Sequence, residues 1–95
     1  MGAKVPETID RENLGSVTLI MGKFAGATTE NSIDDGDTWT SNVPSIIAQW
    51  ANGTNAPTTN TQGIDVGLTT PASGVLTFQT GSADRQAIVF ILARN

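Results

Sequence analysis

The chain has 95 residues, and its 5 basic and 9 acidic side chains give it a net charge of -4. A chain of this length forms one domain with a modest hydrophobic core. Its acidic balance argues against nucleic acid as a partner, because proteins bind phosphate backbones with cationic surfaces. Histidine and cysteine are absent, which excludes disulfides, thiolate nucleophiles, Cys/His zinc sites and the usual general base near neutral pH. We therefore expect a protein that is not an enzyme and that carries no cofactor.

The composition predicts an all-β fold. Glycine, threonine, asparagine and serine are abundant, a combination that suits half-buried strands joined by tight turns. We expect a small antiparallel β-sandwich or barrel with at most one short helix. No segment approaches the roughly 18 apolar residues of a membrane span, and the N-terminus has no apolar stretch typical of a secretion signal. We therefore expect a soluble chain without membrane contact.

Residues 1–15 differ in composition from the remainder of the chain. They are rich in charge, contain Pro6 and have few large apolar side chains. We interpret them as an N-terminal arm attached to a single β domain at residues 16–95. The arm is either a frayed terminus or a segment that orders against a neighbouring subunit.

In residues 16–24 the side chains of Val17, Leu19 and Met21 alternate with those of Thr18, Ile20 and Gly22. This alternation predicts a strand with both faces at least partly covered. An acidic turn follows at residues 34–37, where Asp34, Asp35 and Asp37 surround Gly36. Such carboxylates are weak candidates for calcium ligands, because calcium prefers several oxygens within one turn. The spacing does not match an EF-hand loop, so a hydrogen-bonded turn is the alternative and we predict no metal site.

Residues 43–51 are ambiguous between a helix and a strand. The apolar residues recur at 43, 46, 47 and 50, which favours a short amphipathic helix with Pro44 in its first turn. The alternative is a strand with Ile46, Ala48 and Trp50 on one face, since short apolar runs fit both structures.

Beyond a long loop at residues 52–63, three strands are expected at residues 64–70, 75–80 and 86–93. Their glycine-containing connectors have the lengths of hairpins, so we predict an antiparallel meander. The last strand is apolar on both sides: Ile88, Phe90 and Leu92 face one way, and Val89 and Ile91 face the other. Such a strand is either central in a sandwich or lies against another subunit.

The candidate interface residues are Trp39, Trp50, Val89 and Ile91. Tryptophan is enriched at the energetic centres of protein interfaces. Each tryptophan could equally be a packing anchor in the core or a platform on which a sugar ring stacks.

Five segments together resemble small proteins of tailed bacteriophages: residues 34–41, 43–50, 57–59, 73–78 and 87–94. The resemblance covers about residues 16–94 and leaves residues 1–15 outside. It implies a structural component of the virion, of the capsid decoration or cement type.

The resemblance carries several expectations about partners. It implies a β-rich domain that binds the outer capsid surface, bridges subunits of the major capsid protein and forms a homo-oligomer, most simply a trimer. The chain would be made in the host cytoplasm and reside on the virion. A tail, neck or fibre accessory protein is the alternative within the virion, and a carbohydrate-binding module is the alternative outside it.

Overall fold

The computed structural model describes residues 2–54, 66–69, 73–81 and 83–95. These residues form two antiparallel sheets that pack face to face, which confirms the expected all-β class. The strands are β1 (Thr8–Asn13), β2 (Val17–Phe24), β3 (Thr38–Thr40), β4 (Ile46–Gly53), β5 (Val66–Leu68), β6 (Val75–Thr80) and β7 (Ala87–Arg94). One turn of 3-10 helix, η1 (Thr29–Asn31), lies between β2 and β3.

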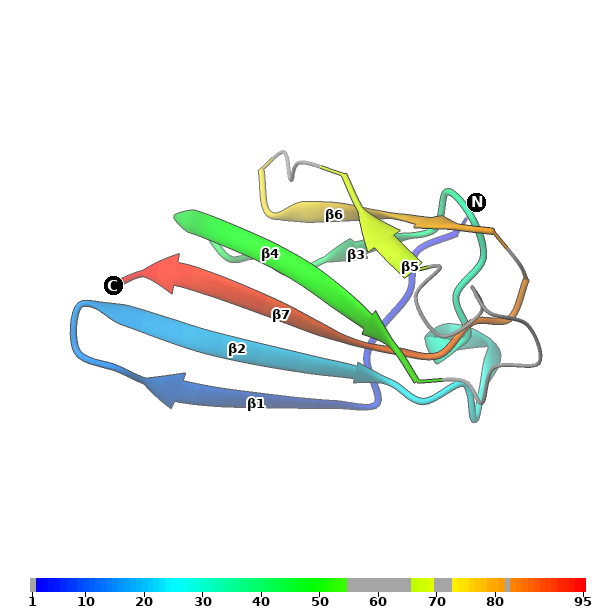
Figure 1. The fold of residues 1–95 in the computed structure, drawn as a ribbon, viewed down its shortest axis with the longest axis horizontal. Coiled ribbons are helices and arrows are strands. Elements are labelled where there is room, and N and C mark those ends of the chain that lie inside the picture. Colours follow the sequence, from blue (N-terminus) through cyan, green and yellow to red (C-terminus); the bar gives the residue numbers. More distant parts are fainter. Residues whose placement is uncertain (1, 55–65, 70–72, 82) are drawn as a thin grey trace.

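The larger sheet has the strand order β1-β2-β7-β4, and the smaller one has the order β3-β6-β5. In Figure 1 the four strands of the larger sheet lie side by side, and the C-terminus follows β7 at the end of the sheet that lies far from the N-terminus. Strand β7 is central because β2 and β4 flank it on both edges. This central position covers both edges of β7 but only one of its two apolar faces, because the second sheet packs on one side alone.

The hydrophobic core fills the space between the two sheets. From β7 it takes Ala87, Val89, Ile91 and Ala93, which are at most 6% exposed. Three aromatic rings from different strands meet at its centre: Phe24 contacts Trp39 and Phe78 edge to face, with ring centroids 5.4 and 5.2 Å apart. Edge-to-face contacts of this kind stabilise a core beyond the area that they bury.

Residues 43–51 do not form the helix that their apolar spacing favours. Residues from Ile46 onward form the edge strand β4, which pairs with β7. A β-bulge at Ile47 shifts the register, so Ile46 packs against the core whereas Ala48 and Trp50 lie opposite the outward-facing residues of β7. The strand alternative was therefore right about the element but wrong to place Ile46 on the same face as Trp50, because a bulge inserts one extra residue.

The predicted meander is correct for one hairpin and wrong for the next strand. Strands β5 and β6 pair, but β6 and β7 belong to different sheets, and the connection between them crosses from one sheet to the other. Strand β7 pairs instead with β2 along one edge and with β4 along the other, and this places one of its apolar faces between the two sheets. Residues 52 and 53 of the predicted loop belong to β4, and the loop lies outside the described residues from 55 to 63, as do positions 64, 65 and 70 of the strand expected at 64–70.

The N-terminal residues belong to both sheets, which differs from the separate arm expected at residues 1–15. Ala3 forms a parallel bridge with Thr38 of β3, and the backbone N–H of Lys4 donates to the Thr38 carbonyl at 2.6 Å. Thr8–Asn13 then pairs with β2 as the edge strand β1. The charged side chains of Asp10, Arg11 and Glu12 fit in this strand because all six residues of β1 are exposed to solvent.

Candidate interaction surface

The carboxylates of the acidic turn accept hydrogen bonds from backbone N–H groups of other segments. Asp37 is 2% exposed, and its carboxylate accepts the backbone N–H groups of Gly2 and Asp34 at 2.8 and 2.7 Å. Lys4 pairs with the same carboxylate at 3.5 Å. The turn therefore ties the N-terminal segment to the start of β3.

Burial alone would raise the pKa of Asp37. The two backbone hydrogen bonds and the nearby Lys4 ammonium outweigh this effect, so that the pKa lies below its ordinary value of 3.8. Asp37 is consequently held as a charged structural acceptor.

The other two carboxylates of the turn also hold backbone groups. Asp35 accepts the N–H of Thr80 at 3.0 Å, and Asp34 accepts the N–H of Asp84 at 2.8 Å. Because their oxygens point to different backbone segments, the three carboxylates do not converge on one point. Within the described parts of the chain, no group of three or more acidic side chains is arranged to hold a metal ion.

Three of the four candidate interface residues lie in the core. Trp39 is 5% exposed, and Val89 and Ile91 are fully buried between the sheets. The fourth, Trp50, is 43% exposed on β4. On β7 the residues that face outward are the alternate ones, so Phe90 and Leu92 take the place that the sequence interpretation gave to Val89 and Ile91.

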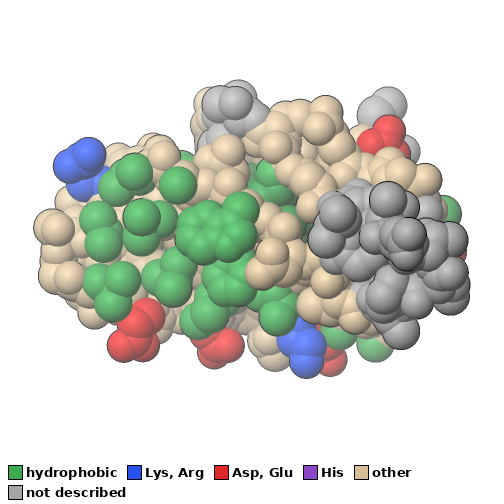
Figure 2. Space-filling view, in the orientation of Figure 1, with side chains coloured by type: hydrophobic (Ala, Val, Ile, Leu, Met, Phe, Trp, Pro, Cys, Tyr) green, Lys and Arg blue, Asp and Glu red, His purple; other side chains and the backbone are tan. Residues whose placement is uncertain are grey.

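The side of the four-stranded sheet that faces away from the core carries a continuous hydrophobic surface. We call it the outer apolar face, and it consists of Leu19, Met21, Ala48, Trp50, Ile88, Phe90 and Leu92. Figure 2 shows these hydrophobic side chains gathered over the region that β2, β7 and β4 occupy in Figure 1.

The pairing register explains how the outer apolar face is built. Met21, Phe90 and Trp50 are direct cross-strand partners, and they form one row across three strands. The rings of Trp50 and Phe90 lie nearly parallel, 13° apart, with centroids 5.2 Å from each other. Leu19, Leu92 and Ala48 form the next row.

Charged side chains border this face without interrupting it. Asp10 and Glu12 of β1 lie opposite Met21 and Leu19, and Figure 2 shows acidic side chains along that edge. Lys23 ends the face at the end of β2. An apolar centre with a charged rim is typical of a protein interaction site.

A sequence signal for this face exists in the alternation of β2 and β7. Leu19 and Met21 alternate with Thr18 and Ile20, and both faces of β7 are apolar. What the sequence lacks is the position of the second sheet, which decides which of the two apolar faces of β7 is covered.

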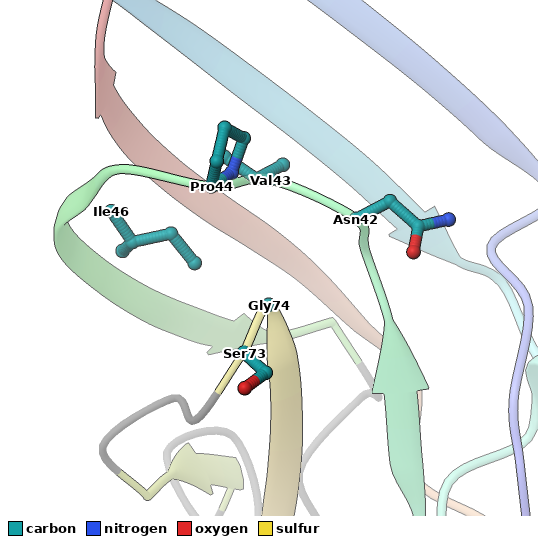
Figure 3. Close-up of a pocket in the computed structure, with 6 residues that line it drawn as sticks. All are labelled: Asn42, Val43, Pro44, Ile46, Ser73 and Gly74. Carbon is teal, nitrogen blue, oxygen red and sulfur yellow. The ribbon is translucent and has the colours of Figure 1, made fainter.

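A depression of about 520 Å³ lies where the β3–β4 connection meets the turn before β6 (Figure 3). Its lining is Asn42, Val43, Pro44, Ile46, Ser73 and Gly74. Asn42 and Ser73 both adopt left-handed backbone angles, with φ of 59° and 53°. None of these described lining residues is charged, and their polar groups are amides and one hydroxyl, which offer no acid–base chemistry near neutral pH.

Comparison of the chain with known protein families, with curated proteins and with solved structures finds no match. In the described residues, no helix has the length and apolar character needed to cross a membrane. The outer apolar face and the residue chemistry of the chain are therefore the features that bear on function.

Proposed function

We propose that the protein is a structural component of a tailed-bacteriophage virion, of the capsid decoration type. It would bind the outer surface of the shell, bridge subunits of the major capsid protein and stabilise them by contact. The observation that carries a contact role is the outer apolar face, with Trp50 43% exposed near its middle row. The setting on a virion comes from the sequence resemblance.

Residue chemistry supports a role without catalysis. The chain has neither histidine nor cysteine, and the carboxylates of the acidic turn hold backbone groups. The net charge of -4 disfavours nucleic acid as a ligand. A small domain that repeats many times on a lattice gains strength through multivalency, so weak individual contacts suffice.

In this proposal the protein is made in the host cytoplasm and resides on the capsid surface as a homo-oligomer. A trimer follows from the resemblance alone. Oligomers of small domains are physically reasonable because a shared interface adds buried area that one modest core lacks.

The proposal is tested on purified particles from cells that produce the chain. We expect mass spectrometry to find the protein in the particles in high copy number, and antibody labelling to place it on heads. Detection in the cell lysate with none in purified particles would overturn a virion role. Labelling confined to tails, necks or fibres would replace the decoration role with the accessory role.

A carbohydrate-binding module is the second candidate, and the Trp50–Phe90 pair is the observation that favours it. Exposed aromatic rings are the platforms on which sugar rings stack. Glycan binding should change the fluorescence of Trp50, whereas Trp39 in the core should contribute a constant signal. A flat titration over a broad glycan panel would remove this candidate.

A further inference from the structure

We propose that the outer apolar face binds the same face of a second copy of this chain, so that two four-stranded sheets stack into a symmetric dimer. This inference goes beyond the proposed virion role and does not depend on it: it names a second copy of the chain as the occupant of the face, and a dimer would replace the trimer that the resemblance implies.

The two outward faces of the fold differ sharply. On the smaller sheet the core residues Trp39, Leu76 and Phe78 alternate with residues that point outward. Those outward residues are mostly polar: Thr38, Thr40, Val75, Thr77 and Gln79. The smaller sheet therefore follows the usual alternation of an antiparallel sheet with one solvated face, whereas the larger sheet is apolar on both faces.

This contrast favours a second copy over a ring of copies. In a two-fold dimer, both partners use the same patch, so one apolar face is sufficient. A head-to-tail ring such as a trimer needs two different complementary patches on each copy. The other large exposed apolar side chains of the described residues are Val5, Ile9, Leu14 and Ile47, and none of them belongs to a comparable continuous sheet face.

The area of the face is sufficient for a weak interface. Its three strands, β2, β7 and β4, are spaced about 4.8 Å apart and are about eight residues long at about 3.4 Å per residue, which gives a footprint of about 400 Å². Two stacked copies then bury about 800 Å² in total, which is below the standard size and in the range of weak, transient contacts. The dimer should therefore be weak and depend on concentration.

The rim charges select one orientation of the pair. Asp10 and Glu12 lie along a single edge of the face, and the β4 edge opposite carries no charge on this side. A two-fold axis across the strands would place one acidic row over the other, which is unfavourable. An axis parallel to the strands places each acidic row beside the partner's uncharged β4 and removes this repulsion.

The test is the solution mass of the chain, measured by light scattering over a concentration series, for the wild type and two variants. We expect a transition from the 9.9 kDa monomer to a dimer. Trp50→Glu should raise the dissociation constant by about 30-fold or more, because it removes a large aromatic contact and places a charge in the apolar interface. Val5→Glu is the matched control, since Val5 is 57% exposed outside the face, and it should leave the dimer unchanged.

A second measurement needs no substitution and covers the case in which the Trp50 variant does not fold. Dimerisation buries Trp50, so the emission of the wild type should shift to shorter wavelength as its concentration rises, while buried Trp39 stays constant. A monomer at every concentration, a trimer, or a dimer that Trp50→Glu leaves intact would each overturn the inference. Particle analysis decides the virion role separately, so either idea can fail without the other.

Discussion

Asp37 is a buried charged side chain, and its hydrogen bonds and its ion pair explain why the fold accommodates it. Its two oxygens accept one backbone N–H each, from Gly2 and Asp34, and Lys4 supplies a compensating charge. A buried charge without such partners is strongly unfavourable. The carboxylate therefore joins two parts of the chain that are far apart in sequence.

Replacing Asp37 by asparagine should lower the free energy of unfolding by about 1–3 kcal/mol near neutral pH, because charge-assisted hydrogen bonds are lost and Lys4 is left without its partner. The pKa of Asp37 is lowered in the folded state, so its contribution is complete above the ordinary value of 3.8 and declines as the pH falls below that value. Urea unfolding of the wild type and of the Asp37→Asn variant should therefore give a difference in unfolding free energy that decreases as the pH falls below 3.8.

Asp35→Asn is the control for this comparison. Asp35 is exposed, and an asparagine oxygen can still accept the N–H of Thr80. We expect a change below about 0.5 kcal/mol, as for ordinary surface substitutions. A gap between wild type and Asp37→Asn that stays constant through the acid range would contradict the lowered pKa.

At the scale of an element, β7 combines two environments in one strand. Ile91 is fully buried between the sheets, whereas Ile88 is half-buried on the side of the sheet that faces away from the core. The two side chains are identical in size and hydrophobicity, so a difference between them reports environment alone.

Ile91→Ala should cost about 2–5 kcal/mol of unfolding free energy, as expected for a cavity in a packed core. Ile88→Ala should cost less than about 1.5 kcal/mol, because its side chain is already partly solvated. Urea denaturation at a concentration where the wild type is monomeric separates these values from any effect of association. Equal costs for the two substitutions would contradict the assignment of the two faces of β7.

The sequence predicts the strands better than it predicts their partners. The apolar alternation of β2 and β7 is local, and both appear close to the expected positions. The β4 segment is ambiguous because Val43, Ile46 and Trp50 satisfy helical spacing, while its strand conformation depends on pairing with β7, whose residues lie 34 to 47 positions away from their partners. Long-range pairing of this kind has no local signature in one sequence.

The same limit applies to the candidate site. Trp39 and Trp50 are equivalent as sequence features, yet one packs on Phe24 in the core and the other lies on the exposed face. Their difference depends on which strand belongs to which sheet. The hydrogen-bonded alternative for the three aspartates of the turn is confirmed, although three of the four backbone N–H groups that they accept lie at least 35 residues away in the sequence.

At the scale of the whole molecule, the N-terminal segment connects the two sheets. Residues 2–5 run along the edge of β3, and β1 extends the other sheet only a few residues later. The N–H of Thr38 donates to the Gly2 carbonyl at 2.9 Å, and the N–H of Val5 donates to the Glu30 carbonyl at 2.8 Å. The segment therefore covers a strand edge that would otherwise present unpaired backbone groups.

Deletion of residues 1–5 should lower the free energy of unfolding by about 3 kcal/mol or more, since several hydrogen bonds of about 1 kcal/mol each are lost together. It should also expose the amide of Thr38 to rapid hydrogen exchange while amides in β2 and β7 stay protected. Lys4→Met is the control, because it removes the ion pair with Asp37 but keeps the backbone pairing to β3. Thr38 should stay protected in that variant, and equal exchange of Thr38 in the wild type and the deletion would show that the segment does not hold the β3 edge.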